Sequence, residues 1–262
     1  MTDSAYDAAP SPDPRPFPVL AKVGLALAAV AGLLLLVSGP GTRAGVWSFI
    51  TGLTLFKYGA YLAVPAAVVC LAAALVTRPG TGRRGFVPSL AAALAIGAAF
   101  AFVFVRVSSA RGAPPIHDIT TDTKNPPAFV AVLPARRETA LNPLGYEGDS
   151  VAALQVKAFP DVKPVMLALS PDSAFAVALG AAKAMGWEVV DANRGEGRIE
   201  ATDRTFWFGF ADDVVIRVMP ASGISRVDVR SESRVGRGDA GTNAARVRAY
   251  LARLKPYAAV AG

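Results

Sequence analysis

The chain has 262 residues, of which 53% are hydrophobic and 18% charged, so it is more apolar than ordinary soluble domains at roughly 45–50%. Its net charge of +7 is spread along the chain, which argues against a nucleic-acid-binding protein with one concentrated basic face. The single cysteine, Cys70, excludes an intramolecular disulfide. This composition favours a membrane protein.

The N-terminal part of the sequence predicts a tail followed by a membrane domain. Residues 1–18 are rich in proline and aspartate without apolar periodicity, which is typical of a disordered segment. The first apolar stretch of residues 19–106 would be about 27 Å long as a helix, close to the roughly 30 Å hydrocarbon core. A break at residues 38–41 should end it. The three expected spans are residues 20–37, 55–76 and 87–105.

The basic residues of the short loops predict the orientation. Arg78, Arg83 and Arg84 make the loop between the second and third spans the most basic connection, and such loops face the cytoplasm. Three spans then place the N-terminus in the cytoplasm and everything after Arg106 outside it. In a bacterium this is a multi-pass inner-membrane protein with an extracytoplasmic C-terminal domain.

Residues 107–169 are rich in proline and aperiodic, and we expect an extended strap over the domain that follows. Its residues 129–133 could pair with a sheet edge. From Ser170 to residue 256 the pattern becomes regular. Ser170 is an N-cap, Pro171 takes the first helical position and Gly186 ends the helix.

Alternating segments then predict four strands: residues 187–192, residues 198–202 and 206–210 as one strand broken at Asp203-Arg204, residues 214–219 and residues 224–233. Asp212 and Asp213 are expected in a turn. A final helix over residues 240–254 has Asp239 as its N-cap. We therefore predict a two-layer α+β domain. In the sequence, a four-stranded antiparallel meander is preceded by one helix and followed by another. Both helices are expected to pack on the same face of the sheet.

Several motifs of this domain resemble the domain-of-unknown-function family 1499, including members with N-terminal membrane spans. They are residues 186–187, 197–202, 209–217 and 227–236, followed by Asp239 and residues 243–246, with an earlier match at residues 115–122 and 126–129. The resemblance implies an uncharacterised bacterial membrane protein and carries no established activity. The element order is also similar to helix-grip domains of envelope lipoproteins, at the level of the fold alone.

The junction of the last strand and the last helix is the first candidate site. Residues 236–241 fit G-x-G-x-x-G, but neither a second parallel strand nor a downstream acidic residue follows, so we expect no cofactor. A helix start beside arginines could still bind a small anion. Alternatively, the arginines pair with Asp212, Asp213, Asp228 or Glu232. The ligand-binding candidates are Arg230, Ser231, Arg234, Asp239, Asn243 and Arg246.

A second candidate site contains the only histidine, His117, with Asp118 and Asp122. Zinc sites draw three or four protein ligands from His, Cys and carboxylates, and nothing else here supplies nitrogen or sulfur, so we expect no metal. A loop whose Asp and Thr side chains bind their own backbone is the simpler interpretation.

Two functions follow from these patterns. The first is a non-enzymatic module whose partners are the lipid bilayer and either an envelope protein or a small anionic ligand, with no nucleic acid. The alternative is a membrane-anchored envelope hydrolase that uses His117, Asp118 and Asp122 with the arginines between Arg230 and Arg246. The sequence leaves open whether the protein is an enzyme.

Overall fold

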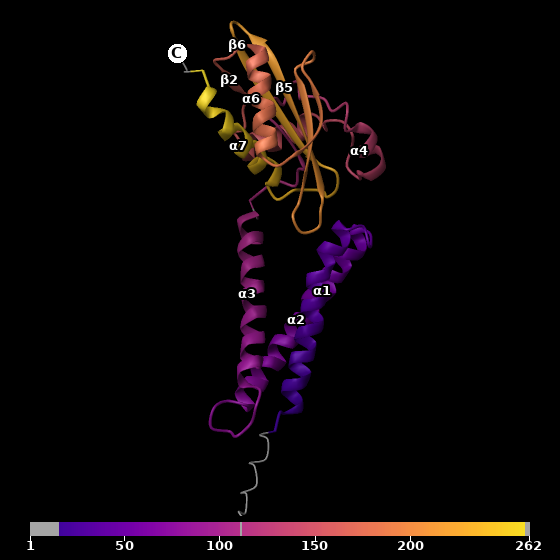
Figure 1. Cartoon of the computed structure of the whole chain (residues 1–262), viewed down its shortest axis with the longest axis vertical. Helices are drawn as coiled ribbons and strands as arrows, with labels where there is room; N and C mark the ends of the chain where they lie inside the picture. Colours follow the sequence, from indigo (N-terminus) through magenta and orange to yellow (C-terminus); the bar gives the residue numbers. More distant parts are fainter. Residues whose placement is uncertain (1–15, 111, 260–262) are drawn as a thin grey trace, which may run out of the picture. The chain divides into compact units, whose positions relative to one another are not determined.

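The computed structural model describes residues 16–110 and 112–259, and most of the expected tail at residues 1–18 lies outside them. The chain divides into two compact units, Met1–Val105 and Arg106–Gly262. Both are drawn in Figure 1.

The first unit is built from three helices, α1 (Val19–Arg43), α2 (Phe49–Val76) and α3 (Phe86–Ala110). Each contains a segment long and apolar enough to cross a membrane, and the segment of α3 ends at Val105. The prediction of three membrane-spanning helices at the N-terminus is confirmed at this level.

The predicted break at residues 38–41 is wrong, because α1 continues through Pro40 to Arg43. Proline removes one backbone donor from a helix interior. Side chains bind the backbone beside it. The carbonyl oxygen of Ser38 accepts hydrogen bonds from Thr42 Oγ1 at 2.9 Å and Trp47 Nε1 at 3.2 Å. The second helix also begins earlier than expected, at Phe49, with Ser48 as its N-cap.

Glycines let α1 and α2 approach closely, as small residues do at helix contacts in membranes. A Cβ atom at Gly52 would lie 1.9 Å from Thr42 Oγ1 and 2.8 Å from the carbonyl oxygen of Ser38. At Gly24 it would lie 3.1 Å from Sγ of Cys70, which is fully buried. The two helices are therefore packed too tightly for larger side chains at these positions.

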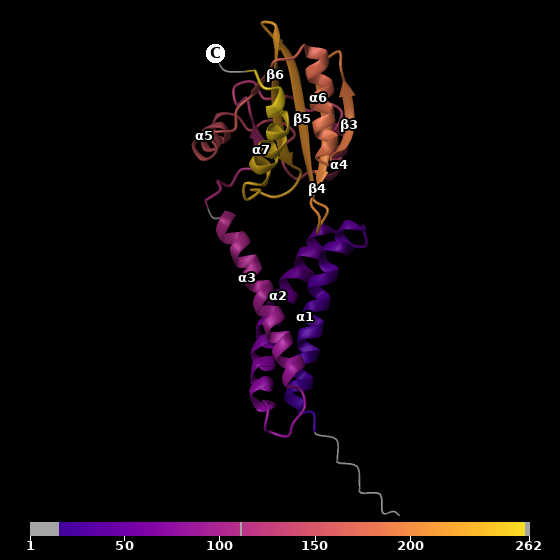
Figure 2. The same cartoon turned by 60° about the vertical axis from the view of Figure 1, so that its left-hand side comes forward.

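The second unit is an antiparallel sheet with two helices on one face (Figures 1 and 2). The strands β3 (Glu188–Asn193), β4 (Arg198–Arg204), β5 (Ala211–Ala221) and β6 (Ile224–Ser233) form the meander. The helices are α6 (Pro171–Ala184) and α7 (Thr242–Leu254), followed by a short 3-10 helix, η1 (Lys255–Tyr257). This confirms the predicted α+β fold, in which a four-stranded meander follows one helix in the sequence and precedes the other.

The apolar core lies between the sheet and these helices. It contains Ile199, Ile216 and Val229 from the strands, and it contains Phe175 and Val247 from the helices. The ring of Tyr250 stacks on Trp187 with 5.3 Å between centroids, and its hydroxyl donates to the carbonyl oxygen of Ala178 at 3.0 Å. The hydroxyl group of Tyr250 therefore has a hydrogen-bond partner inside the core.

The segment expected as an extended strap, residues 107–169, contains four further elements: β1 (Asp118–Thr120), α4 (Leu133–Thr139), α5 (Asp149–Ala158) and β2 (Val165–Leu167). Both strands pair antiparallel with β6, so the sheet has six strands among the described residues. The suggested edge pairing of residues 129–133 is not made, because these residues lead into α4.

Two local predictions in the meander are wrong. Residues 206–210, expected as strand, form the turn between β4 and β5, closed by the hydrogen bond from Thr205 N to Phe210 O at 2.9 Å. Gly209 reverses the chain there with a φ of +70°. Asp212 and Asp213, expected in a turn, lie inside β5. The first prediction failed because alternating aromatic residues are typical of strands. The second failed because adjacent aspartates are typical of turns.

The first prediction concerns the packing of α1 against α2. Replacing Gly52 by Leu should force the helices apart and make Cys70, the single cysteine, react faster with a maleimide in the detergent-solubilised protein. Gly32→Leu is the matched control, because a Cβ atom there meets nothing within 4 Å. Equal labelling rates in the two variants would contradict the close packing at Gly52.

Candidate functional site

The face of the sheet opposite α6 and α7 is charged. Alternation along β6 places Arg226, Asp228, Arg230 and Glu232 on one face. Residues 117–147, here named the covering segment, join the edge of the sheet through β1 and then pack over this face. Ion pairs connect the two layers. We name the resulting set the buried charge network. Its arginines are Arg136, Arg198, Arg217, Arg226, Arg230 and Arg234, and its carboxylates are Asp118, Asp122, Glu200, Asp213, Asp228 and Glu232.

Arg136 is the central cation of this network. It comes from α4, its side chain is fully buried, and its two terminal nitrogens donate to Asp213 at 3.0 Å and Glu232 at 2.5 Å. One of them also donates to the carbonyl oxygen of Pro143 at 3.2 Å. A single guanidinium group therefore links the covering segment to both β5 and β6.

Arg230 fastens β1 to β6. Its Nε and Nη2 atoms donate to the two carboxylate oxygens of Asp118 at 2.9 and 2.8 Å, the fork geometry that guanidinium favours. The centroid of the Phe129 ring lies 4.8 Å from the guanidinium carbon of Arg230 and 5.2 Å from that of Arg136. Cations packed on an aromatic ring add stabilisation in a desolvated site.

Glu200 holds the start of α4. Its carboxylate accepts hydrogen bonds from the backbone N–H groups of Val130, Ala131 and Val132 at 2.9, 3.0 and 3.0 Å, and it pairs with Arg198. These three residues lie immediately before α4, of which Val132 is the N-cap. These bonds explain why residues 129–133 do not join the sheet edge.

A second group of ions lies further along the same face. Asp228 accepts from Arg217 at 3.0 Å and from Arg226 at 2.8 Å. Asp122 accepts from the same two arginines at 3.2 and 2.8 Å. The carboxylate of Asp122 is therefore used to fasten the covering segment, and it lies apart from Asp118 in this network.

Burial shifts the acid–base behaviour of the network. Desolvation, reinforced by the negative charge of Asp118, raises the pKa of Glu232 to about 8. Desolvation also raises the pKa of Asp118, although Arg230 opposes it. The pKa of Tyr146 is raised to about 12 by burial and by Asp118. Arg136 and Arg230 oppose the rise at Glu232, so its pKa reflects a balance between burial and its two cationic partners.

The other ligand-binding candidates lie on the helix side of the sheet. Ser231 donates to Asn243 at 2.7 Å, and Arg246 pairs with Asp212 at 2.6 Å and with Asp203 at 2.8 Å. The expected set is therefore divided between two layers. Arg230 and Arg234 belong to the buried charge network, in which Arg234 contacts Asp213 at 2.8 Å.

Asp239 closes the start of α7. Its carboxylate accepts from the backbone N–H groups of Gly241 at 2.8 Å and Asn243 at 2.6 Å. The formal N-cap is Gly241, two residues after the predicted one, and burial raises the pKa of Asp239. This carboxylate occupies the position that an anionic ligand would take.

His117 is held by its backbone, and its side chain lies beside Glu147. Its carbonyl oxygen accepts from the N–H of Ser233 at 3.0 Å and from Asn243 Nδ2 at 2.9 Å. Its Nε2 atom lies 3.6 Å from Glu147 and is buried without a hydrogen bond within the described part of the chain. Among residues 16–110 and 112–259, no cluster of three or more His, Cys, Asp or Glu could hold a metal.

Sequence reasoning missed Arg136 and Glu200. Arg136 lies in an aperiodic, proline-rich stretch, so no local pattern marks it. The alternation of charge along β6 was the available signal, because a strand with charged residues on one face and apolar residues on the other needs two different covers.

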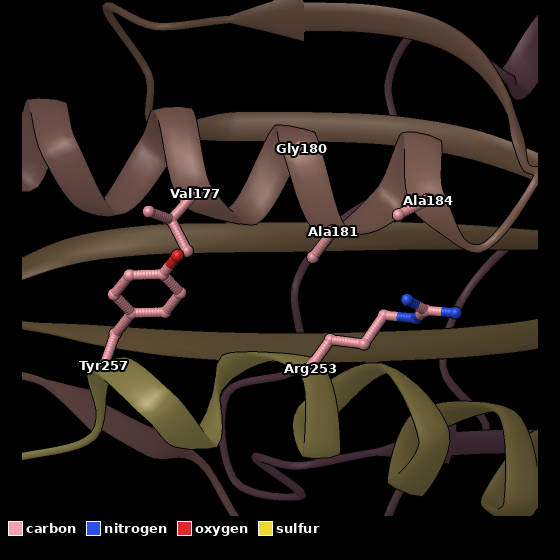
Figure 3. A pocket seen from close by; sticks show the side chains of 6 residues that line it. All are labelled: Val177, Gly180, Ala181, Ala184, Arg253 and Tyr257. Atoms are coloured by element: carbon pink, nitrogen blue, oxygen red, sulfur yellow. The ribbon is translucent and has the colours of Figure 1, made fainter.

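A shallow groove lies between α6 and the C-terminal end of α7 (Figure 3). It has a volume of about 280 Å³. Figure 3 shows the side chains of Arg253 and Tyr257 reaching from one wall towards α6. A Cβ atom at Gly180 would meet nothing within 4 Å, so this glycine leaves the groove open. The lining residues are Val177, Gly180, Ala181, Ala184, Arg253 and Tyr257.

These features define a protein with three apolar helices of membrane-spanning length and an α+β domain. The model of the family described as "Protein of unknown function (DUF1499)" matches residues 118–254, more than half of the chain. The protein belongs to this family, as the motifs indicated. The match runs from the first residue of β1 to the last of α7, so it includes the covering segment from its second residue onward. No curated protein matches the chain.

The second prediction concerns Arg136. Arg136→Ala would leave Asp213 and Glu232 without their shared cation, which should cost about 3–5 kcal/mol of unfolding free energy. The exposed pair of Arg194 and Asp172 supplies the control, and Arg194→Ala should cost about 0–1 kcal/mol. Urea unfolding followed by the fluorescence of buried Trp187 measures both. Similar losses would show that Arg136 is not central to the network.

The third prediction concerns pH. A carboxyl group whose folded pKa is raised binds more protons in the folded state, so stability falls as pH rises. For Glu232 the loss of stability is expected between pH 4.5, the ordinary pKa of its carboxyl group, and about pH 8, its raised pKa in the folded protein. Glu232→Gln should flatten this dependence, remaining closest to the parent protein at low pH. Urea midpoints across the window test it, and an unchanged slope in the variant would contradict the assignment to Glu232.

Proposed function

We propose that the protein is a non-enzymatic interaction module that presents its α+β domain on the extracytoplasmic side of a bacterial inner membrane. Three spans and the basic connection between α2 and α3, which contains Arg78, Arg83 and Arg84, support this orientation. The ion pairing of the buried arginines and carboxylates supports a structural role for them.

The groove between α6 and α7 carries the proposal of a binding site. Gly180 is in the interior of a helix, where glycine costs about 1 kcal/mol relative to alanine, and no neighbouring atom within 4 Å requires its small size. Ala181 and Ala184 continue the small-residue floor, and Arg253 supplies a cation at its edge. An apolar floor beside one positive charge is complementary to an occupant that carries an apolar group and a negative charge.

The dimensions favour a side chain of a partner polypeptide. Pockets that enclose drug-sized ligands have volumes of roughly 300–1,000 Å³ and bury most of the ligand. At about 280 Å³, the groove is better matched to one or two side chains. We propose that the occupant is a segment of an envelope protein that places an apolar side chain against Ala181 and a carboxylate against Arg253.

The hydrolase alternative has less chemical support. Its two aspartates are paired with arginines, Asp118 with Arg230 and Asp122 with Arg226. A general base needs a position within hydrogen-bond reach of the proton that it removes, and these carboxylates are turned into the layer between the covering segment and the sheet. Binding of a small anionic ligand by Arg230 or Arg234 has equally little support, because both arginines are paired with carboxylates in the same layer.

The fourth prediction tests the groove by crosslinking. Tyr257→p-benzoylphenylalanine, illuminated in native membranes, should give an adduct of defined mass that disappears when Gly180→Leu or Arg253→Glu is added. Gly180→Leu should leave the fold intact and stabilise α6 by about 0.5–1 kcal/mol. The matched control is Lys183→Leu, which adds the same side chain on an exposed residue of α6 outside the groove lining.

An adduct that persists in Gly180→Leu, or no adduct at all, would contradict binding at the groove. Alkaline phosphatase fused to the C-terminus checks the orientation in the same cells, since an inactive fusion would place the domain in the cytoplasm.

A further inference from the structure

The turn between β4 and β5 carries four aromatic residues outside the apolar core. We name residues 205–210 the aromatic turn. The side chain of Phe206 is 85% exposed. The rings of Phe208 and Phe210 stack with 5.3 Å between centroids, and those of Phe206 and Trp207 lie 6.5 Å apart. A second closing bond, from Phe210 N to Thr205 Oγ1 at 2.9 Å, fixes the turn.

The register of the sheet shows at which end this turn lies. Asp118 of β1 pairs with Glu232, Glu232 pairs with Asp213, and Asp213 pairs with Thr202 of β4. These four residues form one row across the sheet. The chain enters β1 at this row. It leaves β4 two residues after the row and continues into the aromatic turn, so the aromatic turn and the start of β1 lie at the same end of the sheet. The turn between β5 and β6 lies at the opposite end of the sheet (Figure 2).

The chain joins the domain through a short connection. The membrane-spanning part of α3 ends at Val105, the helix ends at Ala110 and β1 begins at Asp118. Residues 111–117 can extend by at most about 25 Å at roughly 3.5 Å each. The headgroup layer adds about 5–8 Å on each side of the hydrocarbon core. This end of the sheet is therefore the one that the chain tethers to the membrane-spanning helices, and the connection sets an upper limit on its distance from the end of α3.

Further apolar and basic side chains accompany the aromatic turn. Leu141 is 73% exposed, and its backbone N–H donates to the carbonyl oxygen of Arg234 at 2.8 Å, just after β6. Arg237 is exposed in the same connection. Arg204, at the end of β4, has a half-exposed side chain 3.7 Å from Glu188. Aromatic rings and basic residues together are typical of protein surfaces at the membrane–water interface.

We propose that the aromatic turn inserts into the headgroup interface of the membrane that the three helices span, with Arg204 and Arg237 binding anionic lipid headgroups. The partner is a lipid surface. Tryptophan suits this layer because its ring is apolar while its N–H can bond to water or headgroups. The inference does not depend on the groove between α6 and α7, and it stands whichever partner binds there.

The fifth prediction uses the full chain reconstituted in phosphatidylcholine bilayers. In a Trp47→Phe background the two remaining tryptophans are Trp207 and Trp187, of which Trp187 is buried in the core. Lipids brominated on their acyl chains near the headgroup should reduce the emission of Trp207 relative to unbrominated lipids. Adding Trp207→Phe should remove this loss, because only Trp187 then remains.

The matched control moves the reporter to the other end of the sheet. In the Trp47→Phe/Trp207→Phe background, Ala221→Trp places a tryptophan at the turn between β5 and β6, where brominated lipids should have no effect. Equal emission of Trp207 in brominated and unbrominated lipids would overturn the proposal, as would equal quenching at residues 207 and 221.

Charge provides a second readout. Replacing part of the phosphatidylcholine by phosphatidylglycerol should increase the quenching of Trp207, and added salt should reverse the increase because it screens surface charges. Arg204→Gln/Arg237→Gln should abolish the response to phosphatidylglycerol. Quenching that is the same in both lipid mixtures would overturn the part of the proposal that assigns headgroup binding to the arginines.

Discussion

A carboxylate taken out of water loses several kcal/mol of hydration free energy unless a cation and hydrogen bonds replace the water. The sheet of this domain buries such groups along one whole face. Arg136 from α4 is shared by Glu232 and Asp213, with Arg230 as a second cation for Glu232 and Arg234 as a second for Asp213. Glu200 meets the requirement partly through the backbone of residues 130–132. The path of the covering segment follows from these needs, and the segment is therefore part of the domain.

The two faces of the sheet are held by different forces. On one face the burial of apolar residues such as Val214 and Ile216 attaches α6 and α7, and this attraction is non-directional. On the other face the contacts are directional and depend on individual partners. Arginines and aspartates of the kind that suggest a catalytic or anion-binding site are consumed here in stabilising the fold. The surfaces that we propose for function are the groove, with the guanidinium of Arg253 at its edge, and the aromatic turn.

The sequence was informative where structure is decided locally. Ser170, Pro171 and Gly186 mark the ends of α6, and alternation marks β6. It was uninformative where the partner is distant. β1 and β2 have three residues each, too few for a periodic signal. Asp212 and Asp213 resemble a solvated turn, but Arg246 neutralises the first and Arg136 and Arg234 the second, on opposite faces. Only Arg246 and Arg234 were candidate residues, and nothing nearby in the chain identifies Arg136.

The pairing of β1 with β6 has a consequence for how the chain is made. β1 at Asp118 leaves the ribosome long before Glu232, its partner at the far end of the domain. Until the last strand is synthesised, the covering segment has no surface on which to fold. Contacts between such distant residues slow folding, and a waiting apolar segment would invite aggregation. Apart from the small apolar cluster of Phe129 and Val132 on Val215, the covering segment meets the sheet largely through ions and hydrogen bonds. These groups stay hydrated in the unfolded chain, so most of the layer that forms last remains soluble until β6 is made.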